Sequence, residues 1–392
     1  MTRPGYRPSK VGVIPAAWEV KQLSEVAEIR GGIAKNSNAP AADPISVHYL
    51  RVANVQDGYL NLSDMSVIQL SRRDLSRYTV LPGDVLMNEG GDLDKLGRGA
   101  IWRGESYPCV HQNHVFVVRC KSTLLPDYLN VWTTTSPARR FFLLAGKQTT
   151  NLASISKTSL GELPVAVPPI AEQRAIAAAL SDVDGLLGGL DRLIAKKRDL
   201  KQAAMQQLLT GQTRLPGFTA PWQPRRLSDV APLQRGFDLP TSSLRPGSYP
   251  VVYSNGVLNH HCDFQVEGPG VVTGRSGTIG TVTFVEGRYW PHNTSLWVTT
   301  FRGNDPRFVF YLYTRINFRR FASGSGVPTL NRNDAHSFEV LIPPSKEEQS
   351  TIAAILSDMD AELAALEARR DKTRALKQAM MQELLTGRTR LV

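Results

Sequence analysis

An internal repeat is the feature that most constrains the fold of this chain. Residues 172–215 align with residues 348–391 at a constant offset of 176, and 26 of the 44 aligned positions are identical. Unrelated segments do not agree to this extent, so the chain contains two copies of one unit. Both copies open on a Glu-Gln pair and end on Leu-Leu-Thr-Gly, at 208–211 and 384–387.

Fainter matches extend the repeat upstream. Trp18 recurs as Trp222 at an offset of 204, and Asn113 recurs as Asn293 at an offset of 180. The whole chain is therefore two tandem halves, each a globular segment followed by a helical one. The fall in offset means that the first half carries 24 extra residues between Trp18 and Asn113.

The two helical segments have clear boundaries and a coiled-coil pattern. Each follows a Pro-Pro pair and ends at a glycine, which are common stop signals for helices. In the first copy the apolar positions are spaced by three and four residues, at Leu180, Val183, Leu187, Leu190 and Ile194. Each helix would be roughly 57 Å long at 1.5 Å per residue. The economical partner for each is the other copy, which predicts antiparallel pairing about a pseudo-twofold axis.

The globular segments show short apolar runs between Gly- and Pro-rich turns, which predicts mixed α/β domains. The expected overall class is α+β, with a first domain at 1–167, a spacer helix at 168–215, a second domain at 216–342 and a distal spacer helix at 343–392. Strands are predicted at 100–103, 115–119, 270–273, 280–285 and 296–299, and helices at 126–136 and 306–316.

Charge points to a polyanionic partner. The 46 Lys and Arg residues exceed the 35 Asp and Glu residues by 11, which favours nucleic acid first and an anionic membrane second. The helical spans carry little of this excess: residues 172–215 hold seven basic and five acidic residues, and residues 346–391 hold eight of each. The globular segments should therefore face phosphates while the helices face protein.

Signatures of catalysis or metal binding are missing. The three cysteines form no C-x-x-C pair, and the chain has neither a Gly-x4-Gly-Lys-Ser/Thr phosphate loop nor a His-Glu-x-x-His zinc motif. The Pro-Pro pairs also lack the neighbours that an amino-methyltransferase site requires. The basic start of the chain has no apolar run behind it, and no stretch of about 18 apolar residues occurs. We therefore expect a non-catalytic, cytosolic protein.

Two Gly-rich loops are the first candidates for DNA contact. Residues 90–99 include Lys95 and Arg98, and residues 273–280 include Arg275, Ser276 and Thr278. Small residues let backbone N–H groups approach an anion, and the basic side chains can neutralise phosphate or bind guanine. The alternative is a pair of tight hairpins with solvated charges.

Polar residues near strand entries are the second set of candidates. They are His111 and Asn113 in the first half, and His292 and Asn293 in the second. Asn can bind adenine through two hydrogen bonds, although such residues more often satisfy turn backbone. Weaker candidates for DNA contact are Arg51, Asn54 and Asn255.

This arrangement resembles the specificity subunit of type I restriction-modification enzymes. The resemblance spans essentially the full chain. It is carried by two differing globular segments alternating with two near-identical helices, by the entries at Pro168 and Pro343, by the motifs Glu172-Gln173-x-x-Ile176 and Glu348-Gln349-x-x-Ile352, and by the Leu-Leu-Thr-Gly endings.

The resemblance implies that each globular segment is a target-recognition domain that reads one half of a bipartite, asymmetric site in double-stranded DNA. The helices would set the gap between the half-sites and dock two modification subunits. No cofactor would bind this chain. Modification subunits would carry S-adenosylmethionine and methylate adenine, and restriction subunits would use ATP and Mg²⁺ to translocate and cut DNA.

Two other functions stay open from the residues alone. One is a self-contained DNA-modifying enzyme with a divergent active site, which methyl transfer by the purified chain would reveal. The other is a coiled-coil adaptor that binds only protein, which the positive charge outside the helices disfavours. A steep loss of DNA affinity with salt would separate a DNA reader from an adaptor.

Overall fold

A computed structural model describes residues 4–34, 44–92, 96–148, 153–324 and 328–391. The chain forms two compact units. The first unit contains Met1–Gly189 and Arg370–Val392, and the second contains Leu190–Arg369. The C-terminal stretch of the sequence is therefore part of the first unit. Among the described residues, no helix is both long and apolar enough to cross a membrane.

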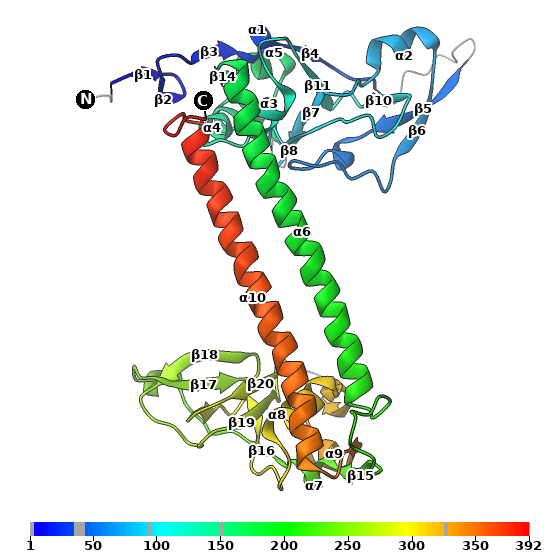
Figure 1. The fold of residues 1–392 in the computed structure, drawn as a ribbon, viewed down its shortest axis with the longest axis vertical. Coiled ribbons are helices and arrows are strands. Elements are labelled where there is room, and N and C mark those ends of the chain that lie inside the picture. Colours follow the sequence, from blue (N-terminus) through cyan, green and yellow to red (C-terminus); the bar gives the residue numbers. More distant parts are fainter. Residues whose placement is uncertain (1–3, 35–43, 93–95, 149–152, 325–327, 392) are drawn as a thin grey trace. The chain divides into compact units, whose positions relative to one another are not determined.

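The predicted long helices are confirmed as α6 (Ile170–Leu208) and α10 (Lys346–Leu384), of 39 residues each. Within each unit the two helices lie side by side and antiparallel (Figure 1). In the first unit Lys377 Nζ donates to Asp184 Oδ1 at 2.6 Å, and in the second unit Lys197 Nζ donates to Glu362 at 2.8 Å. Seam positions such as Leu190 are buried, as the spacing predicts.

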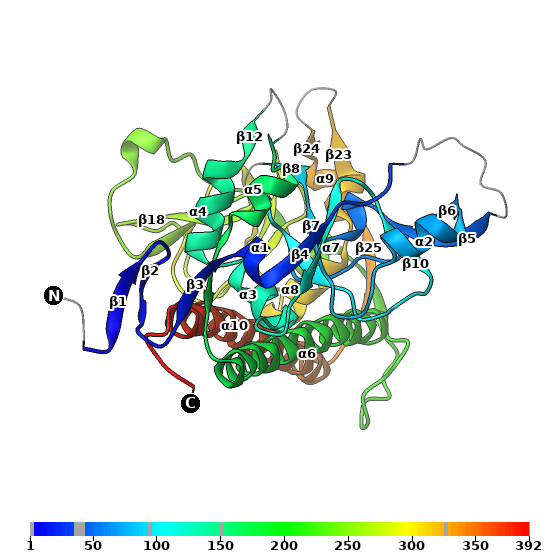
Figure 2. The same ribbon diagram turned by 90° about the horizontal axis from the view of Figure 1, so that it is seen from above.

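Two sheets form the scaffold of the first unit. The four-stranded sheet has the order β4–β11–β7–β9 and is antiparallel throughout. The second sheet has the order β10–β5–β6, with β10 parallel to β5. Strands β5 and β6 of this sheet lie side by side in Figure 2. The bounds are β4 (Ala27–Arg30), β5 (Ile45–Leu50), β6 (Ser66–Leu70), β7 (Val85–Asn88), β9 (Gly99–Ile101), β10 (Cys109–His111) and β11 (Val115–Cys120).

The remaining elements of the first unit are short. Two pairs of strands are β1 (Tyr6–Ser9) with β2 (Gly12–Pro15), and β3 (Glu19–Gln22) with β14 (Pro164–Val167). A small sheet joins β8 (Gly90–Gly91), β12 (Lys147–Gln148) and β13 (Ala153–Ser154). The helices are α1 (Leu23–Val26), η1 (Val52–Asn54), α2 (Arg72–Tyr78), α3 (Pro126–Trp132), α4 (Ser136–Ala145) and α5 (Lys157–Gly161).

The second unit repeats this topology. Its sheets have the orders β16–β22–β19–β20 and β18–β17–β21, and each strand pair has the same direction as its counterpart. The bounds are β16 (Leu233–Arg235), β17 (Tyr249–Tyr253), β18 (Gly256–His261), β19 (Gly270–Gly274), β20 (Val282–Val285), β21 (Trp290–Pro291) and β22 (Ser295–Val298). The tandem repeat therefore includes the globular segments.

Most of the other elements of the second unit also have counterparts among the described elements of the first; η3 (Thr241–Ser243) is the exception. Strand β15 (Gln223–Arg226) pairs with β25 (Glu339–Ile342), and β23 (Ala322–Ser323) pairs with β24 (Thr329–Leu330). The helices are α7 (Leu227–Val230), η3 (Thr241–Ser243), α8 (Pro306–Arg315), η4 (Phe318–Phe321) and α9 (Arg332–Ser337).

The extra residues of the first half lie around β6. Residues 51–65 connect β5 to β6, whereas Ser254 and Asn255 alone separate β17 from β18. Helix α2 follows β6 and has no counterpart between β18 and β19. The two domains thus share a scaffold and differ most at one strand connection.

A buried carboxylate joins the helices to the globular part of each unit. In the first unit Glu172 is fully buried and accepts hydrogen bonds from Trp18 Nε1 (2.9 Å) and from the Arg390 guanidinium. In the second unit Glu348 accepts from Trp222 Nε1 (3.1 Å) and from Arg214 Nε (2.8 Å). A buried charge is stable only when it is paired and hydrogen-bonded.

The glutamine that follows each of these glutamates is also buried, and its side-chain amide is hydrogen-bonded through both its oxygen and its nitrogen. The Gln173 side chain donates to the Thr123 and Pro168 carbonyls and accepts from Leu125 N, at 2.8–2.9 Å. In the second unit the Gln349 side chain donates to Asn304 Oδ1 and to the Pro343 carbonyl and accepts from Asp305 N. The Glu-Gln opening of the helical repeat therefore fixes each helix start to its own globular domain.

Candidate nucleic-acid interface

Three segments of the second unit meet at one place. They are the tip of the β17–β18 hairpin, the loop after β19 and the residues before β22. The backbone N–H groups of Arg275 and Ser276 both donate to the Thr294 carbonyl, at 2.9 and 3.2 Å. Ser254 N donates to Thr294 Oγ1 at 3.3 Å. The structure thus brings together candidate segments that are distant in the sequence.

Gly274 permits this close approach. A Cβ at this position would overlap the carbonyl oxygens of Thr278 and Ser254, so any larger residue would push the loop off the hairpin. Gly277 has a φ of +78°, in the left-handed region that other residues avoid. The glycines of this loop are therefore required for its packing, whether or not an anion binds to its backbone N–H groups.

The predicted side chains of the second unit lie mostly at the surface. Asn255 and Thr278 are exposed, and Arg275 and Ser276 are half-buried. The His292 ring lies 4.3 Å from the Tyr253 ring, centroid to centroid, and burial lowers the pKa of His292. At neutral pH its ring is therefore uncharged and can both donate and accept hydrogen bonds.

Asn293 is already engaged: its Nδ2 donates to Asp238 Oδ1. Asp238 also lies 3.3 Å from the Arg235 guanidinium. A DNA contact by Asn293 would therefore compete with this carboxylate.

The corresponding segments of the first unit meet in the same way. Glu89 N donates to the His114 carbonyl at 2.9 Å, and Gln112 N donates to the Leu50 carbonyl at 2.8 Å. Asn88 Nδ2 donates to the Val55 carbonyl at 2.9 Å, which ties the long β5–β6 connection to β7. This cluster is built on the same strands as the cluster in the second unit.

The predicted basic residues of the first cluster are paired with carboxylates. Arg51 Nη2 donates to Asp64 Oδ2 at 2.8 Å. Arg98 Nε lies 4.0 Å from the Asp57 carboxylate, which also pairs with Arg139 at 3.1 Å. Binding a phosphate there would compete with these ion pairs.

Asn113 and Lys95 complete the predicted set in the first unit. Asn113 is half-buried, and its Nδ2 lies 3.2 Å from His114 Nε2. Lys95 lies outside the described residues.

Asn54 and His111 are buried and have structural roles. The Asn54 amide donates to the carbonyls of Asn61 and Asp64 and so closes the β5–β6 connection. His111 is 1% exposed, and its Nδ1 lies 2.6 Å from the Val115 carbonyl oxygen. Burial lowers the pKa of His111 to about 4. Neither side chain faces solvent, so neither belongs to the surface proposed below.

Two arginines that sequence reasoning missed lie beside Arg275. Arg235 on β16 and Arg332 on α9 line the same hollow of about 440 Å³, together with Asn331 and Asn333. These arginines are far apart in the sequence, and only the pairing of β16 with β22 and the position of α9 after β24 bring them together.

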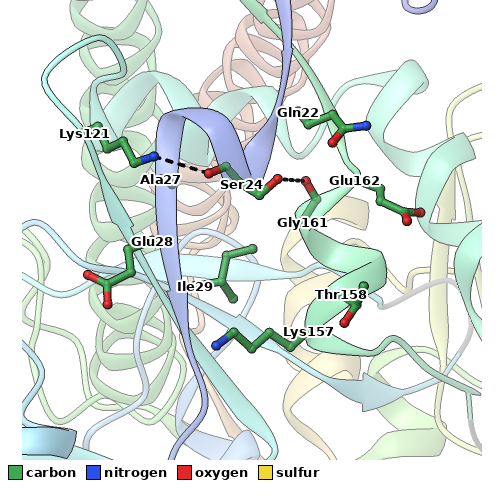
Figure 3. A pocket seen from close by; sticks show the side chains of 10 residues that line it. All are labelled: Gln22, Ser24, Ala27, Glu28, Ile29, Lys121, Lys157, Thr158, Gly161 and Glu162. Carbon is green, nitrogen blue, oxygen red and sulfur yellow. Dashed lines mark hydrogen bonds between the residues drawn. The ribbon is translucent and has the colours of Figure 1, made fainter.

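A hollow of about 720 Å³ in the first unit has mixed charge. It is lined by Lys121 and Lys157 and also by Glu28 and Glu162 (Figure 3). Lys121 Nζ donates to backbone carbonyls of α1, among them that of Glu25 at 2.8 Å. The first unit thus offers no comparable concentration of positive charge in this hollow.

Comparisons with known proteins agree with this architecture. A family model described as the type I restriction modification DNA specificity domain matches residues 15–194 and again residues 220–374. The putative type I restriction enzyme MjaX specificity subunit of Methanocaldococcus jannaschii is 23% identical, over 98% of this chain and 97% of that protein. The type I restriction enzyme EcoKI specificity subunit of Escherichia coli is 22% identical, over 51% of this chain and 43% of its own length.

A solved structure shares the fold. The S subunit of a type I restriction-modification system from M. genitalium matches with a TM-score of 0.63 and 14% identity, covering 94% of this chain and 96% of that one. The tandem domains, the shared scaffold and the paired long helices are therefore explained together. The chain belongs to the type I restriction modification DNA specificity family, as a subunit that recognises DNA sequence through two tandem target-recognition domains.

Proposed function

We propose that the globular segments 1–167 and 216–342 each read one half of a bipartite, asymmetric site in double-stranded DNA. The observation that supports this best is that the two units share one backbone scaffold but carry different side chains at equivalent positions. The sheets of the two units have the same strand order, but their contact loops differ in length and charge. Two readers with different side chains at equivalent positions favour two different half-sites.

Affinity and specificity would come from different groups. Lys and Arg contacts to phosphates supply affinity that weakens with salt, whereas a few side chains per domain discriminate bases at about 1–3 kcal/mol each. Linking two readers on one chain makes the second binding step intramolecular, which multiplies the selectivity of both.

The helices α6 and α10 would fix the spacing and dock the partners. Their sequences, identical at 26 of the 44 aligned positions, favour two similar docking places, each for one modification subunit that carries S-adenosylmethionine. Restriction subunits that use ATP and Mg²⁺ would join this assembly. The chain itself would carry no catalytic group, and the enzyme would exist only as the complete complex.

A matched insertion in both helices tests the spacing role. One heptad added to each of α6 and α10 keeps the apolar seam in phase and lengthens the pair by about 10 Å, or about three base pairs of DNA. We expect the mapped methylated-adenine motif to keep both half-sites and to gain a longer gap.

An insertion in one helix alone serves as the control, because it breaks the antiparallel pairing and should abolish methylation. An unchanged gap after the double insertion, or altered half-sites, would contradict the proposal.

A further inference from the structure

We propose that the hollow lined by Arg235, Arg275 and Arg332 binds a phosphate of the DNA backbone, and that the second unit therefore supplies more of the salt-dependent affinity than the first. This inference rests on the proposed function and adds a phosphate site to it. The three residues are called the arginine clamp below.

The clamp is positively charged and accessible. Among the described residues, no carboxylate pairs with Arg275 or Arg332, and no acidic residue lines the hollow. Arg235 is exposed and lies 3.3 Å from Asp238, so its charge is partly offset. Uncompensated guanidinium groups present several N–H donors in a planar fork that matches phosphate oxygens.

Backbone bonds connect the clamp to the candidate reading surface. The Arg275 carbonyl accepts from Leu330 N at 2.8 Å, and its N–H donates to the Thr294 carbonyl at 2.9 Å. Arg275 is thus fixed between the start of α9 and the residues that precede β22. A phosphate held here would set the position of DNA relative to Thr278 and His292.

The first unit offers a built-in comparison at the same backbone positions. In the first unit Ile155 N donates to the Glu89 carbonyl. In the second unit Leu330 N makes the same bond to the Arg275 carbonyl. Glu89 is therefore the counterpart of Arg275. Ser156 and Asn331 cap helices α5 and α9, so Lys157 corresponds to Arg332.

Close glycine contacts complete this register. Gly32 packs against the carbonyl oxygens of His111 and Gln112, and Gly236 packs in the same way against those of Pro291 and His292. The preceding Gly31 therefore corresponds to Arg235. Where the second unit has three arginines, the first has Gly31, Glu89 and Lys157. Glu89 is moreover paired with His114 at 2.8 Å.

The positive charge of the hollow favours a phosphate group over an uncharged base. Arginine side chains only donate hydrogen bonds, and the asparagines at the rim add further donors and acceptors. The net charge of the hollow favours an anion. Because a phosphodiester is the same at every step of DNA, the clamp should strengthen binding to any sequence.

The test compares the double variant Arg275→Gln with Arg332→Gln to the wild type, each as the full chain in complex with its modification subunits. Fluorescence anisotropy would measure the Kd for a labelled duplex of mixed sequence at several NaCl concentrations. Each lost phosphate contact lowers the slope of log K against log salt by about 0.9. Because the clamp holds one phosphate, we expect a loss of about 0.9 in slope and of about tenfold in affinity near 0.1 M salt.

Three control variants make the result specific. Lys157→Gln removes the counterpart charge in the first unit and should change the slope by less than half as much as Arg332→Gln alone. Arg288→Gln removes an exposed charge of the second unit that is already paired with Glu267 at 3.0 Å, and should change the slope little. The charge-conserving pair Arg275→Lys with Arg332→Lys should keep most of the slope and so excludes a folding defect.

The outcomes are distinguishable. An unchanged slope in the double Gln variant would overturn the clamp while leaving the proposed function intact. The double Gln variant could instead lose affinity only for DNA that contains the recognised motif and bind mixed-sequence DNA as the wild type does. That result would show that the arginines contact bases and would overturn the phosphate assignment. Failure of the wild-type complex to bind DNA in a salt-dependent way would refute the proposed function itself.

Discussion

Replacing Arg390 by alanine should destabilise the first unit strongly, although Arg390 lies near the end of the sequence. Its guanidinium donates twice to the fully buried carboxylate of Glu172, with Nη2 to Oε2 at 2.8 Å. Without Arg390 only Trp18 Nε1 would bind that charge. Removing one partner of a buried ion pair costs about 3–5 kcal/mol, and a unit of this size loses about 2–4 °C in melting temperature per kcal/mol, so we expect a fall of roughly 6–20 °C.

Differential scanning calorimetry of the full chain would measure this fall. The matched variant Arg214→Ala leaves Glu348 without its guanidinium in the second unit, and should lower a transition of that unit by a similar amount. A double variant tests the cause directly. Glu172→Gln in the Arg390→Ala background removes the uncompensated charge, so it should recover part of the lost melting temperature. A fall below about 2 °C, or a further loss in the double variant, would refute the reasoning.

Two further predictions concern Gly274 in the second unit and His111 in the first. Gly274→Ala should lower the affinity for mixed-sequence DNA severalfold, because the added methyl group displaces the loop that carries Arg275. Fluorescence anisotropy would measure this affinity. Gly287→Ala is the control, because a Cβ at that position meets no neighbour within 4 Å. A loop that tolerates alanine at 274 would show that the close packing is unimportant. The first unit should also lose about 3 kcal/mol of stability as the pH falls from about 6.5 to about 4, because unfolded His111 takes up a proton that the buried ring refuses. The free energy of unfolding of His111→Gln should lack this part of the pH dependence, and equal pH profiles for the two proteins would contradict it.

Local patterns predicted the long helices and the central strands. The spacing of apolar residues by three and four through Leu180 and Leu190 was sufficient to predict α6, because helical periodicity is a local property of the sequence. The predicted strands at 115–119 and 270–273 are confirmed as β11 and β19, which are apolar runs bounded by turn residues. Hairpin β17–β18 was not predicted, because β18 is mostly exposed and carries a polar sequence.

The candidate site could be predicted only in part, because burial and pairing are tertiary properties. Asn54 and Asn255 look equally available in the sequence, but the first is buried in a loop and the second is exposed at a hairpin tip. Arg235 and Arg332 could not be associated with Arg275 without strand register. The repeat itself indicated which segments correspond in the two halves, and in both halves the same strand ends meet.

The division of the chain between the two units has a consequence for protein synthesis. Residues 190–369 are all available before residue 370 leaves the ribosome, whereas the first unit also needs Leu384, Leu385 and Arg390 for its core and its buried ion pair. Domains usually fold in the order in which they are made. Here the unit whose synthesis begins first is completed after the other, so a nascent chain would hold an exposed Glu172 and an open apolar core until Arg390 has left the ribosome.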